Sequence, residues 1–329
     1  MVKKILFVMA LILSTVLGCY VGKVSASLEL MDRNEGTKLS DVDLGDIEVK
    51  TDKSIVNILV IGSDSRAELG DEEYGRSDTM MIATLDKKHG RLKVTSLMRD
   101  MYVDIPGYGK NKFNAAYSFG GPDLLYKTIA TNFGITLDGY VEVDFDAFKD
   151  IVDEVGGVDI TLTEQEAQYL NTTNYIHGVK NRNVVAGLNR MNGAQALGYC
   201  RVRKVANYAG TNNDQGRTER QRWVMEGVFD RVKQMPMSKW MDILDAVLPN
   251  ISTDISNKQI ISYGTDIISM GTTELDQYRI PVDGYYHDAK YSGAGDVLEL
   301  DLVSNKELLK SFIFDYDGEA ETTTESAGE

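Results

Sequence analysis

Three short apolar runs between residues 57 and 100 constrain the fold of this chain most. Residues 58–61, 80–85 and 92–97 each have the length and the β-branched content of a buried strand. Charged residues flank these runs, so a sheet built from them would carry charges along its edge. The flanking charged residues are Asp64, Arg66, Arg76, Asp78, Arg99 and Asp100.

Carboxylates and guanidinium groups at strand ends suit a site for phosphate and a metal ion. A hard cation such as Mg²⁺ is commonly held by one or two carboxylates together with phosphate oxygens of the substrate. Arginine side chains bind the remaining oxygens in bidentate fashion. Asp64 and Asp78 are the candidate metal ligands. Surface ion pairs at loop ends are the alternative, and this stretch alone does not separate the two interpretations.

Strands and helices alternate beyond this stretch. Residues 102–105 and 139–143 have strand patterns, and residues 122–133 and 145–155 have helical apolar spacing. The alternation favours an α/β fold in which a mixed central sheet is sandwiched by helices. Lys112 ends a loop just before a predicted short helix, where its ammonium would either face an anion or be solvated.

A second informative stretch follows the predicted helix at residues 192–199. An extended backbone would place Arg201 and Arg203 on one face, as a clamp for a diphosphate, with Cys200 and Val202 turned into the core.

The next helix is predicted over residues 214–235, with an inward stripe of Val224, Val228 and Val232. Stepping back from Val224 prolongs this inward face with polar side chains. They are Arg220 or Gln221, and then Arg217. A helix start suits an anion, and a structural pair between an arginine and a carboxylate is the alternative.

The N-terminus predicts a membrane segment. Two lysines precede the uncharged residues 5–22, which are just long enough as a helix to span a bilayer. Three interpretations stay open: an uncleaved anchor, a signal peptide cleaved near residues 24–26, and a lipoprotein lipidated at Cys19. All three place the rest of the chain outside the cytoplasm. Cys19 and Cys200 are the only cysteines, and no disulfide is expected.

Composition limits the partners. The 329 residues carry a net charge of -15, and an acidic chain without a basic run lacks the footprint of a nucleic-acid-binding protein. We predict an anchor or signal segment over residues 1–26, an acidic spacer over 27–53, one domain over 54–314, and a disordered acidic tail over 315–329. The sequence has no GxSxG, HExxH or P-loop motif.

Several motifs in a fixed order resemble the LytR-CpsA-Psr family. They are GSDSR, GRSDTMM, the pair Arg99-Asp100, KFNAAY from Lys112, EVDFDAFKDIVDEVGGVDI, ALGYCRVRK and GRTERQ, and they span roughly residues 55–234. The resemblance implies a membrane-anchored phosphotransferase with its N-terminus in the cytoplasm. Such an enzyme moves a phospho-glycan, for example a teichoic acid or capsule chain, from a polyprenyl diphosphate to peptidoglycan. The implied fold is an α/β sandwich that accepts the polyprenyl tail between sheet and helices.

The resemblance also assigns roles to residues. Asp64 and Asp78 would hold Mg²⁺ or Mn²⁺. The residues that would line the diphosphate site are Arg76, Arg99, Lys112, Arg201, Arg203, Arg217 and Gln221. Asp78, Arg99 and Asp100 are the candidate catalytic residues, with Asp100 either the base that deprotonates the acceptor or a turn cap. Two features depart from the family pattern: Met98 stands where the family commonly has proline, and the polar loop after Arg203 is long. They leave the identity of the glycan open and do not change the implied reaction class.

Two other functions compete with transfer. A phosphohydrolase of polyprenyl diphosphates would use the same site, with water as the attacking group. A non-catalytic envelope-binding regulator would keep its function in Arg99→Ala and Asp78→Ala variants.

Overall fold

The computed structural model describes residues 27–29, 31–33, 38–64, 75–236, 239, 248–272 and 274–315. The chain forms two compact units. The first comprises Met1–Lys38, Ile61–Ala67 and Tyr140–Gly264, and the second comprises Leu39–Val60, Glu68–Gly139 and Thr265–Glu329. The predicted anchor and most of the predicted tail lie outside the described residues. Among the helices that are described, none is long and apolar enough to cross a membrane.

The second unit contains the predicted strands, except for residues 61–64 at the end of the first of them, which belong to the first unit. They are β2 (Ile55–Asp64), β3 (Arg76–Asp86) and β4 (Arg91–Leu97), followed in sheet order by β11 (Leu275–Ile280). β3 runs antiparallel to β4, whereas β11 runs parallel to β4, so the sheet is mixed as predicted. The three runs identified in the sequence are therefore adjacent strands.

Two helices pack on this sheet. α2 (Ala115–Phe133) and α9 (Leu302–Phe314) contact each other, and both contact β3. Gly120 and Gly121 interrupt the helical conformation of α2 just before Pro122, so the predicted helix start is a kink within a longer helix. Gly134 ends α2 in the left-handed conformation, as predicted.

A smaller sheet completes the second unit. Its order is β12 (Tyr286–Tyr291), β13 (Gly295–Leu300), β5 (Met101–Ile105) and β6 (Gly109–Lys112). β5 and β6 form a hairpin that the sequence had indicated only as a strand followed by a loop. Lys112 is the last residue of β6, where it pairs with Tyr102 of β5.

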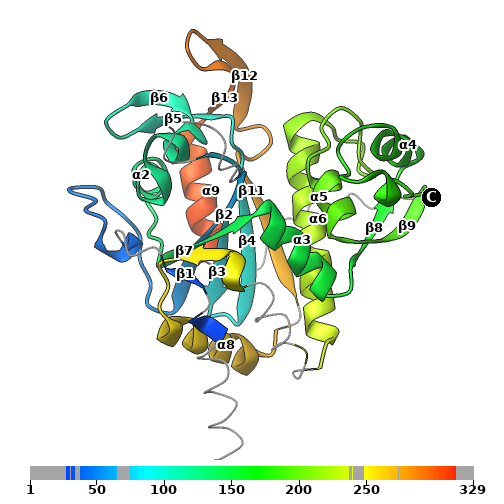
Figure 1. Cartoon of the computed structure of the whole chain (residues 1–329). Coiled ribbons are helices and arrows are strands. Elements are labelled where there is room, and N and C mark those ends of the chain that lie inside the picture. The colour runs from blue at the N-terminus through cyan, green and yellow to red at the C-terminus, as the bar shows by residue number, and fades with distance from the viewer. Residues whose placement is uncertain are drawn as a thin grey trace, which may run out of the picture. The chain divides into compact units, whose positions relative to one another are not determined.

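The first unit is mainly helical (Figure 1). Its helices are α3 (Phe145–Glu154), α4 (Glu164–Thr172), α5 (Gly193–Cys200), α6 (Asn213–Gln234) and α8 (Asn257–Met270), the last of which extends into the second unit. β8 (Val158–Leu162) and β9 (Gly187–Met191) form an antiparallel hairpin, and β10 (Ile251–Thr253) lies between β1 (Asp32–Arg33) and β7 (Gly139–Asp144). The described residues of the first unit also form the short 3-10 turns η2 (Val179–Asn181) and η3 (Leu248–Asn250), whereas the 3-10 turn η1 (Leu39–Asp41) belongs to the second unit.

An apolar core joins α3, α5, α6 and the β8–β9 hairpin. It includes Val152, Ile160, Tyr199, Cys200 and Val224, all of which are buried. The predicted stripe of α6 therefore faces this core. The sequence-based helices at residues 145–155, 192–199 and 214–235 correspond to α3, α5 and α6.

Part of the predicted spacer has packed structure. Leu28 and Met31 are buried against Leu248 in the first unit, and Leu39 is buried in the second. Lys50 forms an ion pair with Asp315, with 3.0 Å between Nζ and Oδ1. The predicted boundaries of the domain at residues 54–314 stay a prediction.

Candidate functional site

Four of the charged residues predicted for the sheet edge lie in the second unit, namely Arg76, Asp78, Arg99 and Asp100, and Asp64 belongs to the first unit. Met81 of β3 pairs with Ser96 of β4 in antiparallel register, so the start of β3 and the end of β4 lie at the same edge of the sheet. Arg76 and Asp78 are in the first three residues of β3, and Arg99 and Asp100 follow β4 directly. Asp64 is the last residue of β2. Arg66 lies outside the described residues, as do the side chains of Asp64, Arg76 and Asp78.

Arg99, Asp100 and Lys112 form one cluster at this edge. The Lys112 ammonium lies 2.6 Å from Asp100 Oδ1, and Arg99 Nε donates a hydrogen bond of 3.3 Å to Asp100 Oδ2. The β5–β6 hairpin returns Lys112 to the turn after β4, where the Asn114 amide donates to the Arg99 carbonyl. The structure thus brings together three of the predicted residues as two cations on one carboxylate.

The first unit contains a second cluster of the same type. Arg203 Nε lies 2.7 Å from Asp214 Oδ1, and the Arg217 guanidinium lies 3.6 Å from the same oxygen. The Arg217 side chain is 6% exposed, whereas that of Arg203 is 43% exposed, so Arg203 is the more accessible of the two. Asp214 lies in the first turn of α6, one turn before Arg217.

The backbone at Arg201 differs from the prediction. Arg201 caps the end of α5 with φ -101 and ψ -9, so the expected extended backbone is wrong at this residue. The helix continues one residue further than the sequence indicated because Cys200 fits the core as its last residue. The Arg201 guanidinium lies over the ring of Phe145, 5.3 Å from its centroid, while Arg203 turns to Asp214.

Cys200 and Val202 are buried, as predicted. Burial raises the pKa of the Cys200 thiol to about 12. Only a thiolate is a strong nucleophile, so this cysteine is a packing residue rather than a catalytic one.

A buried ion pair holds the segment that carries Arg201 and Arg203. Arg220 is fully buried and donates to Glu166 Oε1 at 2.9 Å. Its other nitrogens donate to the carbonyls of Val202 and Val205, at 3.2 and 2.8 Å. Glu166 also accepts from the amide of Thr163 in the capping box of α4. The structural arginine–carboxylate pair weighed in the sequence analysis is therefore present, and it is formed by Arg220.

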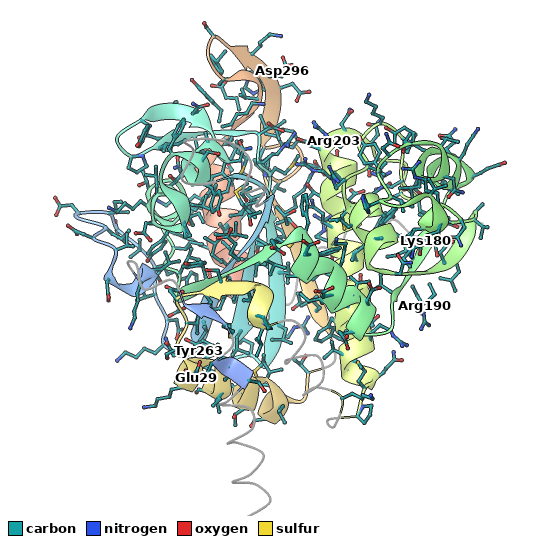
Figure 2. All side chains as sticks on the ribbon, in the orientation of Figure 1. Glu29, Lys180, Arg190, Arg203, Tyr263 and Asp296 are labelled. Atoms are coloured by element: carbon teal, nitrogen blue, oxygen red, sulfur yellow. The ribbon has the colours of Figure 1, made fainter. Side chains whose placement is uncertain are left out.

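The long polar loop after Arg203 is folded onto α6. The Asn207 side chain is buried, accepts from the amides of Ala209 and Thr211, and donates to Glu219 at 2.6 Å. The Asn213 amide then donates to the Arg203 carbonyl at 2.7 Å. These contacts fix Arg203, which is labelled in Figure 2, next to the start of α6. Asp214, its ion-pair partner, lies in the first turn of that helix.

Gln221 is partly exposed on α6. Among the described residues, no group of three or more His, Cys, Asp and Glu side chains is arranged to hold a metal ion. This finding does not apply to the proposed metal ligands Asp64 and Asp78, because their side chains lie outside the described residues. As a donor set, two carboxylates fit a hard cation that completes its shell with substrate oxygens.

A family model tests the resemblance seen in the sequence. The model of the LytR_cpsA_psr family matches residues 19–309. The chain belongs to the LytR-CpsA-Psr family.

Two named relatives are similar to this chain over most of their length. This LytR-CpsA-Psr chain is 33% identical to the polyisoprenyl-teichoic acid–peptidoglycan teichoic acid transferase TagU of Bacillus mycoides, over 87% of this chain and 90% of TagU. It is 31% identical to the regulatory protein MsrR of Staphylococcus aureus, over 80% of this chain and 76% of MsrR.

Solved structures have the same fold. A structure of TagT bound to LIIa-WTA superimposes with a TM-score of 0.63 at 26% identity, covering 86% of this chain and 98% of TagT. The mixed α/β architecture, with a central mixed sheet and helices, is thus the fold of LytR-CpsA-Psr proteins.

Sequence reasoning missed two residues that organise the arginines of this family member. Asp214 was not selected, although its spacing of three from Arg217 on a predicted helix is a readable signal. Phe145 was assigned to a core stripe, and its contact with Arg201 joins segments 56 residues apart, which no local pattern indicates.

Proposed function

We propose that this LytR-CpsA-Psr chain transfers a phospho-glycan from a polyprenyl diphosphate carrier to a hydroxyl group of peptidoglycan. The similarity to the teichoic acid transferase TagU supports this proposal, as do the two cation–carboxylate clusters. The glycan belongs to the class of teichoic acids, capsule chains and other wall polymers. The N-terminal segment would keep the enzyme at the membrane, where a polyprenyl carrier resides.

The observation that carries the proposal is the pairing of Arg203 and Arg217 on Asp214. A carboxylate that forms ion pairs with two guanidinium groups orders them and offsets their charge until an anion arrives. A phosphate oxygen offers the same geometry as the carboxylate oxygen. Arg203 is exposed enough to turn to the diphosphate, with Arg201 beside it in sequence. Gln221 would donate its amide to the same head group, and Arg76 would add a further guanidinium.

The reaction moves one phosphoryl group. The acceptor hydroxyl oxygen forms a bond to the phosphorus that carries the glycan, and the bond from that phosphorus to the bridging oxygen breaks. Polyprenyl phosphate leaves, and the hydroxyl proton passes to a base, for which Asp100 is the candidate. Protein residues contribute chiefly by positioning and by neutralising charge, and Arg99 and Lys112 hold Asp100 in place for this role.

Mg²⁺ or Mn²⁺ would be held by Asp64 and Asp78. The metal would supply neutralisation of the diphosphate charge. Omission of the metal and a separate Asp78→Asn substitution test this assignment. Both should lower transfer and weaken retention of polyprenyl diphosphate. Retention that is unchanged by both would remove these aspartates from the metal site.

Mass spectrometry of the full-length chain tests the proposal directly. We would purify the chain from a bacterial host, denature it and identify any released polyprenyl phosphate or diphosphate. The expected result is a bound lipid that is lost from the Arg201→Ala/Arg203→Ala variant. Arg182→Ala is the matched control. Arg182 is also an arginine of the first unit, but it donates to the Ile176 carbonyl and to the Asn174 side chain and is not part of the Asp214 cluster.

Product analysis separates transfer from its competitors. With added peptidoglycan, transfer yields a phospho-glycan joined to peptidoglycan. A phosphohydrolase yields free phospho-glycan both with and without peptidoglycan. A chain without bound lipid that also fails to take up polyprenyl diphosphate with Mg²⁺ would support a non-catalytic regulator.

A further inference from the structure

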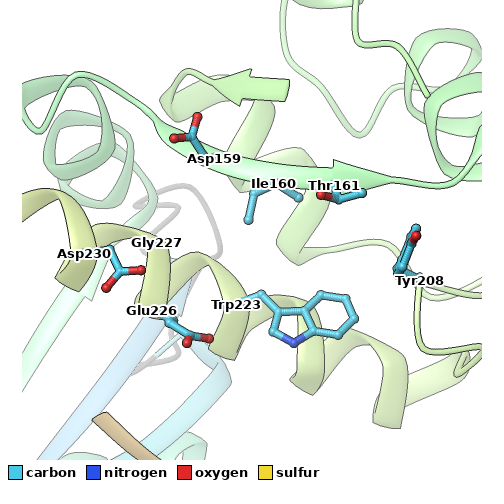
Figure 3. A pocket seen from close by; sticks show the side chains of 8 residues that line it. All are labelled: Asp159, Ile160, Thr161, Tyr208, Trp223, Glu226, Gly227 and Asp230. Carbon is cyan, nitrogen blue, oxygen red and sulfur yellow. The ribbon is translucent and has the colours of Figure 1, made fainter. Parts of the chain in front are cut away.

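A pocket of about 360 Å³ lies between β8 and α6 in the first unit, apart from the arginine cluster. This volume is at the low end of small-molecule sites, which are roughly 300–1,000 Å³. Figure 3 shows its side chains. The lining residues are Asp159, Ile160, Thr161, Tyr208, Trp223, Glu226, Gly227 and Asp230.

Regular spacing builds the pocket on two elements. On α6, Trp223, Gly227 and Asp230 are separated by four and three residues and share one face of the helix. On β8, alternation leaves Asp159 exposed between buried neighbours. Gly227 sets the approach of the two elements, since a Cβ there would lie 3.2 Å from Val158 Cβ.

The two ends of the pocket differ in chemistry. Asp159, Glu226 and Asp230 lie at one end in Figure 3, and Trp223 and Tyr208 lie at the other. Tyr208 is 68% exposed, whereas Trp223 is half-buried against the apolar core. An indole that is held by the core offers a rigid apolar face to a ligand.

Two basic side chains offset part of the negative charge of the pocket. Arg190 donates to both oxygens of Asp159, at 2.5 and 2.8 Å, and Lys233 lies 2.7 Å from Asp230. These contacts fix two carboxylates in place and leave their other lone pairs as hydrogen-bond acceptors. Because Arg190 and Lys233 offset two of the three carboxylates, the pocket is not suited to a small cation. Because the net charge of these side chains is still negative, it is not suited to an anion either.

We propose that this pocket binds one uncharged sugar ring of a glycan chain. The apolar face of the ring lies on the Trp223 indole, and its hydroxyl groups donate to the carboxylates at the opposite end. An aromatic surface combined with a few fixed polar acceptors is the composition that orients a ligand of this kind.

The role of the pocket rests on the proposed function. The donor of that reaction is a polyanionic phospho-glycan, which carboxylates repel. The acceptor strand of peptidoglycan consists of sugar rings with free hydroxyl groups. The pocket is therefore a subsite for the acceptor glycan rather than for the donor.

Calorimetric titration of the full-length chain tests this subsite. The probe is an uncharged tetramer of N-acetylglucosamine. Saturable binding is expected, with a dissociation constant that rises at least tenfold in Trp223→Ala and in Glu226→Gln. Tyr285→Ala is the control, because Tyr285 is an exposed tyrosine of the second unit and should leave the binding unchanged. Trp223→Phe keeps an aromatic face and should restore part of the affinity.

Two further readouts decide between interpretations. Choline and glycerol phosphate should fail to displace the tetramer, and displacement by either would overturn the proposal. Equal binding by the original chain and Trp223→Ala would overturn it as well. Bound polyprenyl lipid, measured on the same samples, should be unchanged in Trp223→Ala. If the original chain retains the lipid but does not bind the tetramer, the pocket alone is refuted. If the original chain binds the tetramer but carries no lipid, the proposed transfer alone is refuted.

Discussion

Arg220 shows how one buried side chain supports several exposed ones. Among the residues that the structure describes, it is the largest fully buried side chain, and its guanidinium joins Glu166, Val202 and Val205. The Val202 carbonyl lies between Arg201 and Arg203 in the chain. A change at Arg220 therefore acts on the predicted diphosphate-binding residues through the backbone that carries them.

We expect Arg220→Met to destabilise the protein by about 3–5 kcal/mol, because it leaves the Glu166 carboxylate buried without its charge partner. Denaturant unfolding measures this loss. The double variant Arg220→Met/Glu166→Leu removes both charges and should recover much of the stability. If the double variant is no more stable than Arg220→Met, the pair contributes through packing rather than charge.

The cluster at Asp100 predicts a functional effect. In Asp100→Asn the side chain loses the charge that holds Lys112 and Arg99, at 2.6 and 3.3 Å in the original chain. Transfer of glycan to peptidoglycan should fall about 100-fold, within the usual range for loss of a general base. Asp104→Asn, an exposed change on β5, is the matched control. Equal rates for both variants would exclude Asp100 from the reaction.

Strands and helices were predictable where a short stretch of sequence carries their apolar pattern. The strands β2, β3 and β4 were found from apolar runs, and α3 and α6 from helical spacing. The β5–β6 hairpin was only half recognised, because its second strand contains mainly polar residues and forms through pairing with β5.

The candidate site was likewise predictable only in part. Arg99, Arg203 and Arg217 were selected from strand ends and helix faces, and each lies in a cation–carboxylate cluster. The pairing of Arg220 with Glu166 was unpredictable in detail, since it joins residues 54 positions apart. Contacts between elements depend on tertiary packing, which a single sequence does not display.

The contact between α3 and α5 leads to a prediction at the scale of elements. A Cβ at Gly193 would lie 2.3 Å from the Lys149 carbonyl oxygen, so the start of α5 packs directly on the backbone of α3. Gly193→Ala should cost about 1–3 kcal/mol, since the backbones must separate. Gly210→Ala is not a suitable control, because that glycine has a positive φ. Gly264→Ala has open space and should be neutral or stabilising in the same unfolding experiment.

At the scale of the whole molecule, excess acidity coexists with buried ion pairs. The net charge is -15, yet Asp86 and Lys93 form a pair 2.7 Å apart with side chains 0% and 3% exposed. Lys93 also donates to the carbonyls of Phe312 and Ile313 at the end of α9. The pair therefore connects the C-terminal helix to the sheet of the second unit.

Acid stability should depend on this pair. Burial opposes the charged form of Asp86, but hydrogen bonds from Lys93 and His89 outweigh it and lower the pKa of Asp86 below its ordinary value of 3.8. A lowered pKa means that the stabilisation is fully present above about pH 4 and is lost as the pH falls through the pKa of the folded state. The free energy of unfolding of the original chain should therefore fall steeply below pH 4.

Asp86→Asn removes this proton linkage. Far-UV circular dichroism during denaturant unfolding, repeated between pH 7 and pH 3, should show a variant that is about 3–5 kcal/mol less stable at pH 7. The difference from the original chain should then shrink toward acid, because only the original chain takes up a proton at Asp86 on unfolding. Asp288→Asn, an exposed change on β12, should leave the pH profile parallel to that of the original chain. A constant difference for Asp86→Asn across the range would show that Asp86 titrates alike in the folded and unfolded states, and that the pair holds α9 through packing and hydrogen bonds instead.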